Sequence, residues 1–544
     1  MRRTAFSSVL LLLTIGCNDG IGPPLSSLSF VTTDITLSSL GENYQLKLSA
    51  KTAQGEDFKN PKITWTSTDP GVATVSETGL ITSVTNGSTE ISVHSGTLTA
   101  TTSVVVAQTP ATIDLSAKKI RFENIGDTAQ IFVVVQDALG SPLVNPTITW
   151  ASDNPSVASV SGSGIVTAID LGQSSIIVQA GTISIASAIS VSHWDQLKPG
   201  YKMTCGIRTS DEVFCWGNNE YGQVGDGTSE QRNTPTPIDE RLAWNSINSM
   251  VNHSCGILSN RSGACWGNNE YGQVGDGTSE QRNTPTPIDG GLLMKQINGG
   301  FQHTCLISVA GTIKCWGRSN FGQLGDGSTS DQSTPNDISL QLDWDDLTAG
   351  SYHTCATTTS GQVYCWGLNQ FGQLGNGTTN NKSNPVPVSE GNIWTIISAG
   401  LYHTCGINQS GEAYCWGLND EQQLGSGRGQ SQWPYPDKVK TANFWVYISA
   451  GRSHSCGLND LGKAFCWGSN EYGQLGDSSQ TDRSQPVPVS GDHTWHHIEA
   501  GTYHTCGVTT DGSGYCWGNN EFSQLGVQAG LNHLIPKKLG IGKY

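Results

Sequence analysis

The stretch HTCGINQSGEAYCWG, from His403 to Gly417, places a histidine and two cysteines where they could do chemistry. Cys405 and Cys415 stand ten positions apart around a Ser-Gly turn signal, and His403 precedes the first cysteine by two residues. On a hairpin centred at Ser410 the two cysteines lie directly opposite each other, with Cβ atoms about 5 Å apart. The histidine shares their face of the strand. The group could therefore be a disulfide, a metal site or a redox pair.

The cysteine pair recurs seven times in the second half of the chain, at intervals close to 50 residues. The first repeat has Met203 in place of the histidine and keeps both cysteines. This favours a role that the two cysteines perform without the histidine. Redox catalysis would require a closer pair with a lowered thiol pKa. We therefore predict one disulfide per hairpin, with buried free thiols or a histidine–cysteine metal set as the alternatives. The predicted disulfides are Cys205–Cys215, Cys255–Cys265, Cys305–Cys315, Cys355–Cys365, Cys405–Cys415, Cys456–Cys466 and Cys506–Cys516.

Six histidines take the same place in successive repeats: His253, His303, His353, His403, His454 and His504. Residues that recur in every unit of a repeat array normally serve the fold, whereas a specific site should break the symmetry. We predict that these side chains pack or form hydrogen bonds. The sequence has no nucleophile elbow, phosphate loop or HExxH motif. We therefore predict no catalytic residue, no metal ion, no cofactor and no enzymatic activity.

Two further groups of residues carry weaker signals. The segment GDGT, Gly225 to Thr228, has the Asp and Gly of a calcium loop, but too few carboxylates stand at binding spacing, so we predict a turn. His493, His496 and His497 could bind a transition metal. We favour a solvated segment between two blades for this cluster.

Short strands must position these residues. Sixty-six glycines, many Ser, Thr and Asn residues, and few long helix-forming stretches predict an all-β protein. Each cysteine pair lies in the same frame: a Trp or Met start, a Gly, His-x-Cys, a turn, Cys-Trp-Gly, Gly-Gln-Leu-Gly and a proline-rich segment. Four short strands per repeat of this length are typical of a propeller blade.

The second half of the chain, over 194–544, resembles the regulator of chromosome condensation repeat family of seven-bladed propellers. The resemblance rests on the motifs AG..HTC, CWG.N and GQLG, which return in successive repeats. It implies a seven-bladed β-propeller. The family includes eukaryotic exchange factors for small GTPases and chromatin binders, and its secreted bacterial members include enzyme inhibitors.

The first half contains two copies of another domain. ITWTSTDPGVATVSETGLITSV from Ile63 is echoed by ITWASDNPSVASVSGSGIVTAI from Ile148, a period of 85 residues. Alternating apolar residues and frequent turn residues predict small β-sandwiches. Both copies, over 25–107 and 108–192, resemble the bacterial immunoglobulin-like group 2 domain. The resemblance implies stalks or adhesive modules on an exported protein.

The chain begins with MRRTAFSSVLLLLTIGC, in which two arginines, an apolar run and small residues precede Cys17. These features are typical of an export signal. Over residues 1–17 the stretch resembles a bacterial lipoprotein signal, in which the cysteine becomes the lipidated first residue. The alternative is an ordinary signal with an incidental Cys17. We expect an extracytoplasmic, membrane-anchored lipoprotein or cell-surface protein. Export to an oxidising compartment would favour disulfides over free thiols in the propeller.

The charge of the chain bears on its partners. A net charge of −16 and a pI near 5.1 argue against nucleic acid. We predict a binding or adhesion protein whose propeller is a platform for an extracellular or envelope protein, and the main alternative is inhibition of an extracellular enzyme. Binding of a glycan comes after these two, as does guanine-nucleotide exchange, which rests on fold analogy alone.

The fifth repeat departs most from the shared frame, in GSGRGQSQWPYPDKV between Gly425 and Val439. It has one extra residue and places two aromatic rings beside prolines. Aromatic and arginine side chains on a stiff loop are typical of binding hot spots. We predict that Arg428, Trp433 and Tyr435 contact the partner, and packing of both rings on the neighbouring blade is the alternative.

Overall fold

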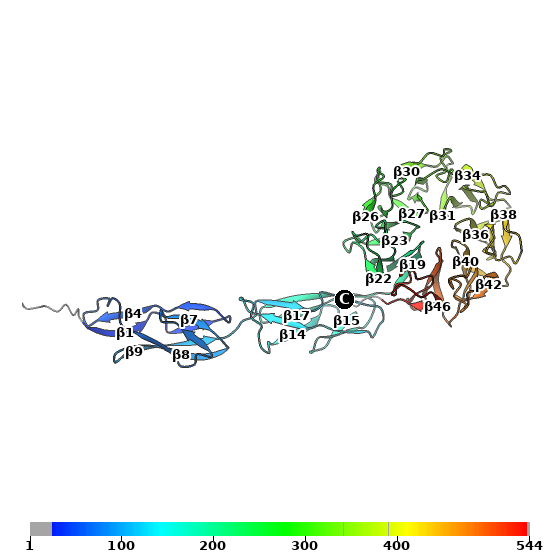
Figure 1. The fold of residues 1–544 in the computed structure, drawn as a ribbon. Coiled ribbons are helices and arrows are strands. Elements are labelled where there is room, and N and C mark those ends of the chain that lie inside the picture. Colours follow the sequence, from blue (N-terminus) through cyan, green and yellow to red (C-terminus); the bar gives the residue numbers. More distant parts are fainter. Residues whose placement is uncertain (1–23, 341, 390, 541–544) are drawn as a thin grey trace, which may run out of the picture.

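The computed structural model describes residues 24–340, 342–389 and 391–540. Every helix or strand in these ranges is a β-strand, so the predicted all-β class is confirmed. Two sandwiches in line are followed by a ring of four-stranded sheets (Figure 1). Within the described ranges, no helix has the length and apolarity needed to cross a membrane. The expected signal and Cys17 lie outside the described residues.

Each sandwich is built from nine strands in the same order. In the first, β2 pairs in parallel with β9 at the edge of a four-stranded sheet, and β11 pairs in parallel with β18 in the second. The first sandwich contains β1 (Leu25–Phe30), β2 (Asp34–Leu37), β3 (Asn43–Gln45), β4 (Leu48–Thr52), β5 (Thr64–Ser67), β6 (Ala73–Val75), β7 (Leu80–Ser83), β8 (Gly87–Ser95) and β9 (Leu98–Val106). The second contains β10 (Thr112–Leu115), β11 (Lys119–Phe122), β12 (Thr128–Gln130), β13 (Val133–Gln136), β14 (Ile148–Ser152), β15 (Ala158–Val160), β16 (Ile165–Ala168), β17 (Gly172–Ala180) and β18 (Ile183–Val191).

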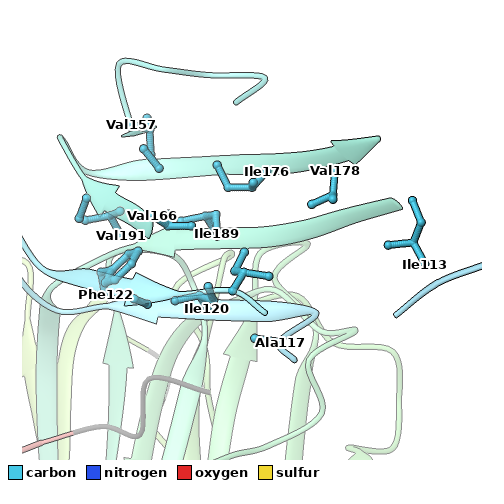
Figure 2. Packing of buried hydrophobic residues seen from close by; sticks show 14 of the residues in the cluster. Ile113, Ala117, Ile120, Phe122, Val157, Val166, Ile176, Val178, Ile189 and Val191 are labelled. Atoms are coloured by element: carbon cyan, nitrogen blue, oxygen red, sulfur yellow. The ribbon is translucent and has the colours of Figure 1, made fainter. Parts of the chain in front are cut away.

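The core of the second sandwich lies between its sheets, where Ile120, Phe122 and Ile176 are fully buried (Figure 2). Apolar residues alternate with polar ones along the long strands, which gives each sheet one buried face. The Trp-to-Gly spacing shared by the copies also has a packing reason. A Cβ at Gly164 would lie 2.7 Å from the Trp150 ring, so only glycine allows the ring to pack there.

The remaining strands form seven blades, each an antiparallel sheet with strands in chain order. The inner strands, nearest the axis, are β19 (Trp194–Pro199), β23 (Trp244–Ser249), β27 (Met294–Gly299), β31 (Trp344–Ala349), β35 (Trp394–Ala399), β39 (Trp445–Ala450) and β43 (Trp495–Ala500). The second strands are β20 (Met203–Arg208), β24 (His253–Leu258), β28 (His303–Ser308), β32 (His353–Thr358), β36 (His403–Asn408), β40 (His454–Asn459) and β44 (His504–Thr509). The third strands are β21 (Val213–Gly217), β25 (Gly263–Gly267), β29 (Ile313–Gly317), β33 (Val363–Gly367), β37 (Ala413–Leu418), β41 (Ala464–Gly468) and β45 (Gly514–Gly518). The outer strands are β22 (Arg232–Pro237), β26 (Arg282–Pro287), β30 (Gln332–Asp337), β34 (Lys382–Pro387), β38 (Gln432–Lys438), β42 (Arg483–Pro488) and β46 (His533–Lys538).

The ring closes by packing the first blade directly against the seventh. Both are formed from consecutive strands, so closure involves no exchanged strand. The backbone N–H of Trp194 donates to the Gly512 carbonyl at 3.1 Å, and the backbone N–H of Thr502 donates to the Gly200 carbonyl at 3.0 Å. Closure therefore depends on side-chain packing and on hydrogen bonds between blades.

Candidate binding site at one end of the propeller

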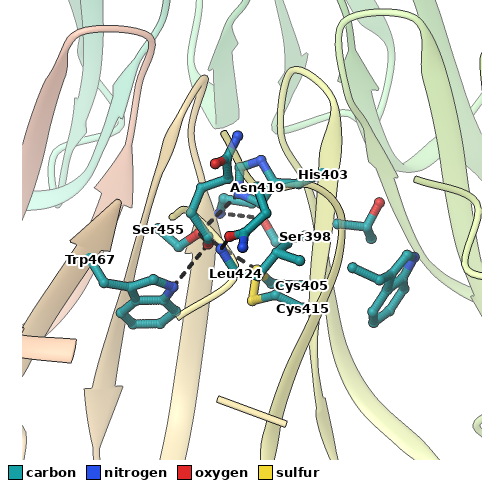
Figure 3. The surroundings of a disulfide bond; sticks show 12 residues. Ser398, His403, Cys405, Cys415, Asn419, Leu424, Ser455 and Trp467 are labelled. Atoms are coloured by element: carbon teal, nitrogen blue, oxygen red, sulfur yellow. Dashed lines mark hydrogen bonds between the residues drawn. A yellow bond between two sulfur atoms is a disulfide. The ribbon is translucent and has the colours of Figure 1, made fainter. Parts of the chain in front are cut away.

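Each blade contains one disulfide across its second and third strands. Cys405 lies directly opposite Cys415 in the register of β36 and β37, and their Cα atoms are 4.0 Å apart. The other six predicted pairs are bonded in the same way. Figure 3 shows the disulfide of the fifth blade beside His403 and Ser455. All fourteen cysteines are fully buried, so the disulfides are structural links.

The six repeated histidines join neighbouring blades. His403 Nε2 lies 2.9 Å from the hydroxyl of Ser455 in the next blade, and that hydroxyl donates to the Gln423 carbonyl at 2.9 Å. Because the hydroxyl hydrogen is used, its oxygen must accept from the histidine, which fixes the Nε2–H tautomer. The same arrangement recurs at the other five histidines, with His504 reaching Thr204 across the closure. Burial lowers the pKa of each of the six to about 3.

The tryptophans of the Cys-Trp-Gly motif make a second tie between blades. The Trp467 indole N–H donates to the same Gln423 carbonyl at 3.0 Å. Equivalent bonds of 2.9 or 3.0 Å occur at each of the six remaining blade boundaries. They include the bond from Trp216 to the Gln524 carbonyl at the closure. The repeated cysteines, histidines and tryptophans of the frame thus hold the blades together. Among the described residues no cluster of three or more His, Cys, Asp or Glu side chains could hold a metal ion.

The GDGT segment forms a turn, as its sequence predicts. The Asp226 carboxylate accepts hydrogen bonds from the backbone and hydroxyl of Thr228, at 3.0 and 2.8 Å, and pairs with Arg232. Asn219 donates to the carbonyls of Thr228 and Glu230 and closes the loop. The Asp226 carboxylate therefore has all these partners within its own loop.

One end of the ring carries most of the half-exposed aromatic side chains of the propeller. It is the end where the first strand of each blade meets the second and the third meets the fourth, and we call it the aromatic end. Its aromatic residues are Tyr201, Phe301, Tyr352, Tyr402 and Tyr503 near the axis and Tyr221, Tyr271, Phe321, Phe371, Tyr472 and Phe522 farther out. Exposed carboxylates precede four of the outer rings, at Glu220, Glu270, Glu471 and Glu521, and Asp420 takes the same position in the fifth blade, which lacks the ring.

The rings of the aromatic end touch one another across blades. Tyr352 lies 5.6 Å from Phe301, 5.6 Å from Phe321 and 6.1 Å from Tyr402, measured between ring centroids. Four of the inner rings, Tyr201, Phe301, Tyr352 and Tyr402, line a funnel of about 310 Å³ at the mouth of the central channel. Arg452 also lines the funnel, with its guanidinium 4.9 Å from the centroid of the Tyr503 ring. The surface has an aromatic centre, a cation and a polar rim.

The second sandwich joins the propeller at the opposite end. Lys119 lies 2.7 Å from Glu212 and 3.0 Å from Glu240, and Arg121 pairs with the same two carboxylates. Glu212 and Glu240 occupy loops at the far end of the first blade from Tyr201. Arg208, which is buried, also donates to the Phe122 carbonyl at 3.2 Å. The sandwich is therefore bound to the end of the ring that the aromatic residues do not occupy.

The three partner-contact candidates of the fifth blade lie near the outer edge of the aromatic end. Arg428 stacks over the Trp433 ring at 5.0 Å and pairs with Asp437 at 3.2 Å. Trp433 is half-buried and packs on the hydrophobic core of its blade and the next. Tyr435 is 42% exposed and covers Gly377 of the fourth blade. The structure thus brings Arg428 and Trp433 together and leaves much of the tyrosine ring open.

The cluster His493, His496 and His497 is divided among three environments. His493 packs against Trp495, His496 is exposed, and His497 lies 3.4 Å from Glu499. The expected solvated segment is wrong for His497, because an inner strand turns this side chain inward, where burial lowers its pKa.

Comparison with known proteins agrees with this architecture. Residues 29–106 and 128–188 match the family model of the bacterial Ig-like domain (group 2). Residues 210–257 and 265–307 match the regulator of chromosome condensation (RCC1) repeat, and residues 290–541 match the RCC1-like domain. The chain is an RCC1-repeat propeller carried on two group 2 bacterial Ig-like domains. The two domain resemblances recognised in its sequence are thereby confirmed.

Solved structures similar to the RCC1 propeller show the same fold. Human WBSCR16 has a TM-score of 0.57 at 18% identity, covering 61% of this chain and 94% of that one. Yeast RCC1 (Prp20), in a complex with Kap60, has a TM-score of 0.56 at 20% identity, with 61% and 84% covered. Prp20p from Saccharomyces cerevisiae has a TM-score of 0.51 at 22% identity, with 57% and 80% covered. At these identities the likeness concerns the fold.

The aromatic end is a feature that no single repeat predicts. Tyr352 and Phe321 are 31 positions apart and belong to different blades, so they meet only once the ring has formed. One signal was present in the sequence, because an aromatic residue follows the Cys-Trp-Gly motif at the same distance in six repeats.

Proposed function

We propose that the chain is a non-enzymatic, extracytoplasmic binding protein whose propeller presents its aromatic end to another protein. The observation that carries the proposal is the position of this end, opposite the loops that bind the second Ig-like domain. The Ig-like domains serve as a stalk. A ligand in the surroundings can then reach the aromatic residues without meeting the stalk.

The composition of the aromatic end supports a protein partner. Specific interfaces have a centre rich in Tyr, Phe and Arg surrounded by a polar rim. Tyr352, Tyr402 and Arg452 provide such a centre, and Glu220 and Glu471 belong to the rim. Aromatic rings that already pack on one another lose little conformational entropy on binding.

Two features support a location outside the cytoplasm. Stable disulfides form in oxidising compartments, and the propeller has one in each blade. The start of the chain has the features of an export signal, with Cys17 as the proposed site of lipidation. A lipid-held stalk would keep the propeller near the envelope. Guanine-nucleotide exchange is not proposed, because an exported chain would not meet a cytoplasmic GTPase.

The test measures binding of the fluorescently labelled mature chain to envelope fragments of the bacterium that encodes it. We expect saturable binding that is lost when the fragments are first treated with protease and kept when their glycans are oxidised with periodate. Binding that survives protease and is lost after periodate would contradict a protein partner. An absence of saturable binding would contradict the proposed platform.

A further inference from the structure

A second, polar cavity lies next to the funnel, among the inner strands of the ring. This cavity, of about 360 Å³, is lined by the inner strands, and we call it the chamber. Ala349, Ala399, Ala450 and Ala500 line both the funnel and the chamber, so the two spaces are neighbours along the channel. Each has a volume typical of small-molecule sites in proteins.

The chamber is where otherwise similar repeats differ. The first and second blades share 25 identical residues, at 215–239 and 265–289. Their inner strands nevertheless read WDQLKP and WNSINS. The fifth position of the inner strand carries Lys198, Asn248, Asn298, Thr348, Ser398, Ser449 and Glu499. Variation at these positions is what a specific site requires, because a symmetric ring of identical side chains could not distinguish one part of a ligand from another.

Most of the charge in the chamber is compensated internally. Lys198 Nζ lies 2.5 Å from Glu499, which also accepts hydrogen bonds from Tyr447 at 2.8 Å and Ser449 at 2.6 Å. Burial alone would raise the pKa of Glu499, but Lys198 and His497 hold it well below its usual range. The lysine is therefore not a free anion site.

Several polar groups of the chamber retain hydrogen-bonding capacity. Asp346 Oδ1 accepts from Gln296 and from the Leu347 N–H, at 2.8 and 2.9 Å, and none of the described residues donates to Oδ2. The hydroxyls of Thr348 and Ser398 accept a backbone N–H from the next blade, at 3.0 Å each, which leaves their hydrogens to donate.

The chamber amides add complementary groups. Asn248 donates through its side-chain nitrogen to the Ile297 carbonyl at 2.7 Å, and its oxygen remains as an acceptor. Asn298 accepts from the Gly299 N–H at 2.8 Å, and its nitrogen remains as a donor. The lining thus offers both donors and acceptors, and its ionisable side chains besides the Lys198–Glu499 pair include the carboxyl group of Asp346.

We propose that the chamber binds a neutral, hydroxyl-rich molecule of monosaccharide size. Each sugar hydroxyl both donates and accepts, which matches the amides, hydroxyls and carboxylate of the lining. The funnel rings offer an apolar surface for the face of a further sugar. The ligand is either a free sugar or the end of a glycan, which share this chemistry. The proposal does not depend on the proposed protein partner.

The test is isothermal titration of the full mature chain with glucose, galactose, mannose and N-acetylglucosamine, each also as its methyl glycoside. We expect at least one to bind with a Kd in the millimolar range or tighter. Binding of the methyl glycoside identifies the end of a glycan as the source, and binding of the reducing sugar alone identifies a free sugar. Asp346→Asn keeps the shape and the bonds from Gln296 and Leu347, and should weaken binding about tenfold by removing a charged acceptor.

The matched control is Asp345→Asn, because Asp345 is adjacent, exposed and paired with Lys295 outside the chamber. It should bind the sugar like the wild type. Asn298→Ala provides a second chamber variant, and thermal unfolding checks that each variant is folded. The proposal is overturned if no sugar of the panel binds the folded wild type, or if the chamber variants bind as well as the Asp345→Asn control.

Discussion

His403 Nε2 lies 2.9 Å from the Ser455 hydroxyl of the next blade, and both side chains are fully buried. The other ring nitrogen, Nδ1, has no hydrogen-bond partner among the described residues. A proton added to this nitrogen would carry a charge into the interior without compensation. Because six blades share this arrangement, acid should weaken the ring as a whole.

The first prediction is a loss of stability between pH 7.5 and pH 5. Each of the six histidines has a pKa of about 3 in the folded state and an unfolded value near 6.5, so the unfolded chain binds more protons in this window. The contribution of these neutral histidines to the free energy of unfolding is complete above pH 6.5 and is lost as the pH falls below that value. Each histidine should lower the free energy of unfolding by about 2 kcal/mol at pH 5, relative to pH 7.5. Urea unfolding at both pH values measures the difference.

The variant for this prediction is His403→Met, since the first blade already pairs Met203 with Ser254 in the equivalent place. It should cost about 1 kcal/mol at pH 7.5 through the lost hydrogen bond. It should also reduce the stability lost between pH 7.5 and pH 5 by about 2 kcal/mol. A pH dependence equal to that of the wild type would contradict the assignment.

The second prediction concerns the disulfides. Alkylation of the denatured mature chain without reductant should label none of the fourteen propeller cysteines, and prior reduction should expose all of them. Replacing both Cys405 and Cys415 with Ser should lower the free energy of unfolding by somewhat under about 3 kcal/mol, the value for closing a short loop. Labelling of most cysteines before reduction would refute the pairing.

The third prediction concerns the membrane anchor. If Cys17 carries lipid, Cys17→Ser should move the protein from the membrane fraction to the soluble fraction, because an attached acyl chain provides the apolar area that holds it. Immunoblots of the separated fractions measure this distribution. A variant that remains membrane-bound would show that another feature provides the anchor.

The fourth prediction separates the two rings of the fifth blade. Tyr435 is 42% exposed, so Tyr435→Ala should weaken capture of the partner by about 2 kcal/mol and lower Tm less than Trp433→Ala does. Trp433 is half-buried under Arg428, so Trp433→Ala should weaken capture and also lower Tm. Binding isotherms and thermal melts give both quantities. Unchanged affinity in both variants would show that the rings serve only the packing of the blade.

The disulfides could be predicted because their cause is local, and the histidine role could be predicted because the residue recurs in successive repeats. Cys405 and Cys415 belong to one hairpin, and a spacing of ten around a turn signal determines their register. The repeat period then extends the result to the other blades. The twofold repetition of the Trp65 and Trp150 motifs made the Ig-like sandwiches recognisable for the same reason.

The aromatic end and the junction could not be predicted because their causes are distant in sequence. Lys119 and Glu212 are 93 positions apart, and their contact depends on how the second Ig-like domain docks. His497 shows the same limit on a smaller scale. Its neighbours in sequence gave no indication that the bulge after Trp495 turns it toward Glu499.

The most direct test of the proposed platform is the affinity of a variant with both Tyr352→Ala and Tyr402→Ala for envelope fragments. The control is Phe444→Ala, which removes a 64% exposed ring from the connection between the fifth and sixth blades, at the end of the ring opposite the aromatic end. Loss of two central rings should cost about 2 kcal/mol or more, which is roughly a thirtyfold rise in Kd, while the control binds like the wild type. Equal affinity of the double variant and the wild type, or an equal loss in the Phe444→Ala control, would contradict the account.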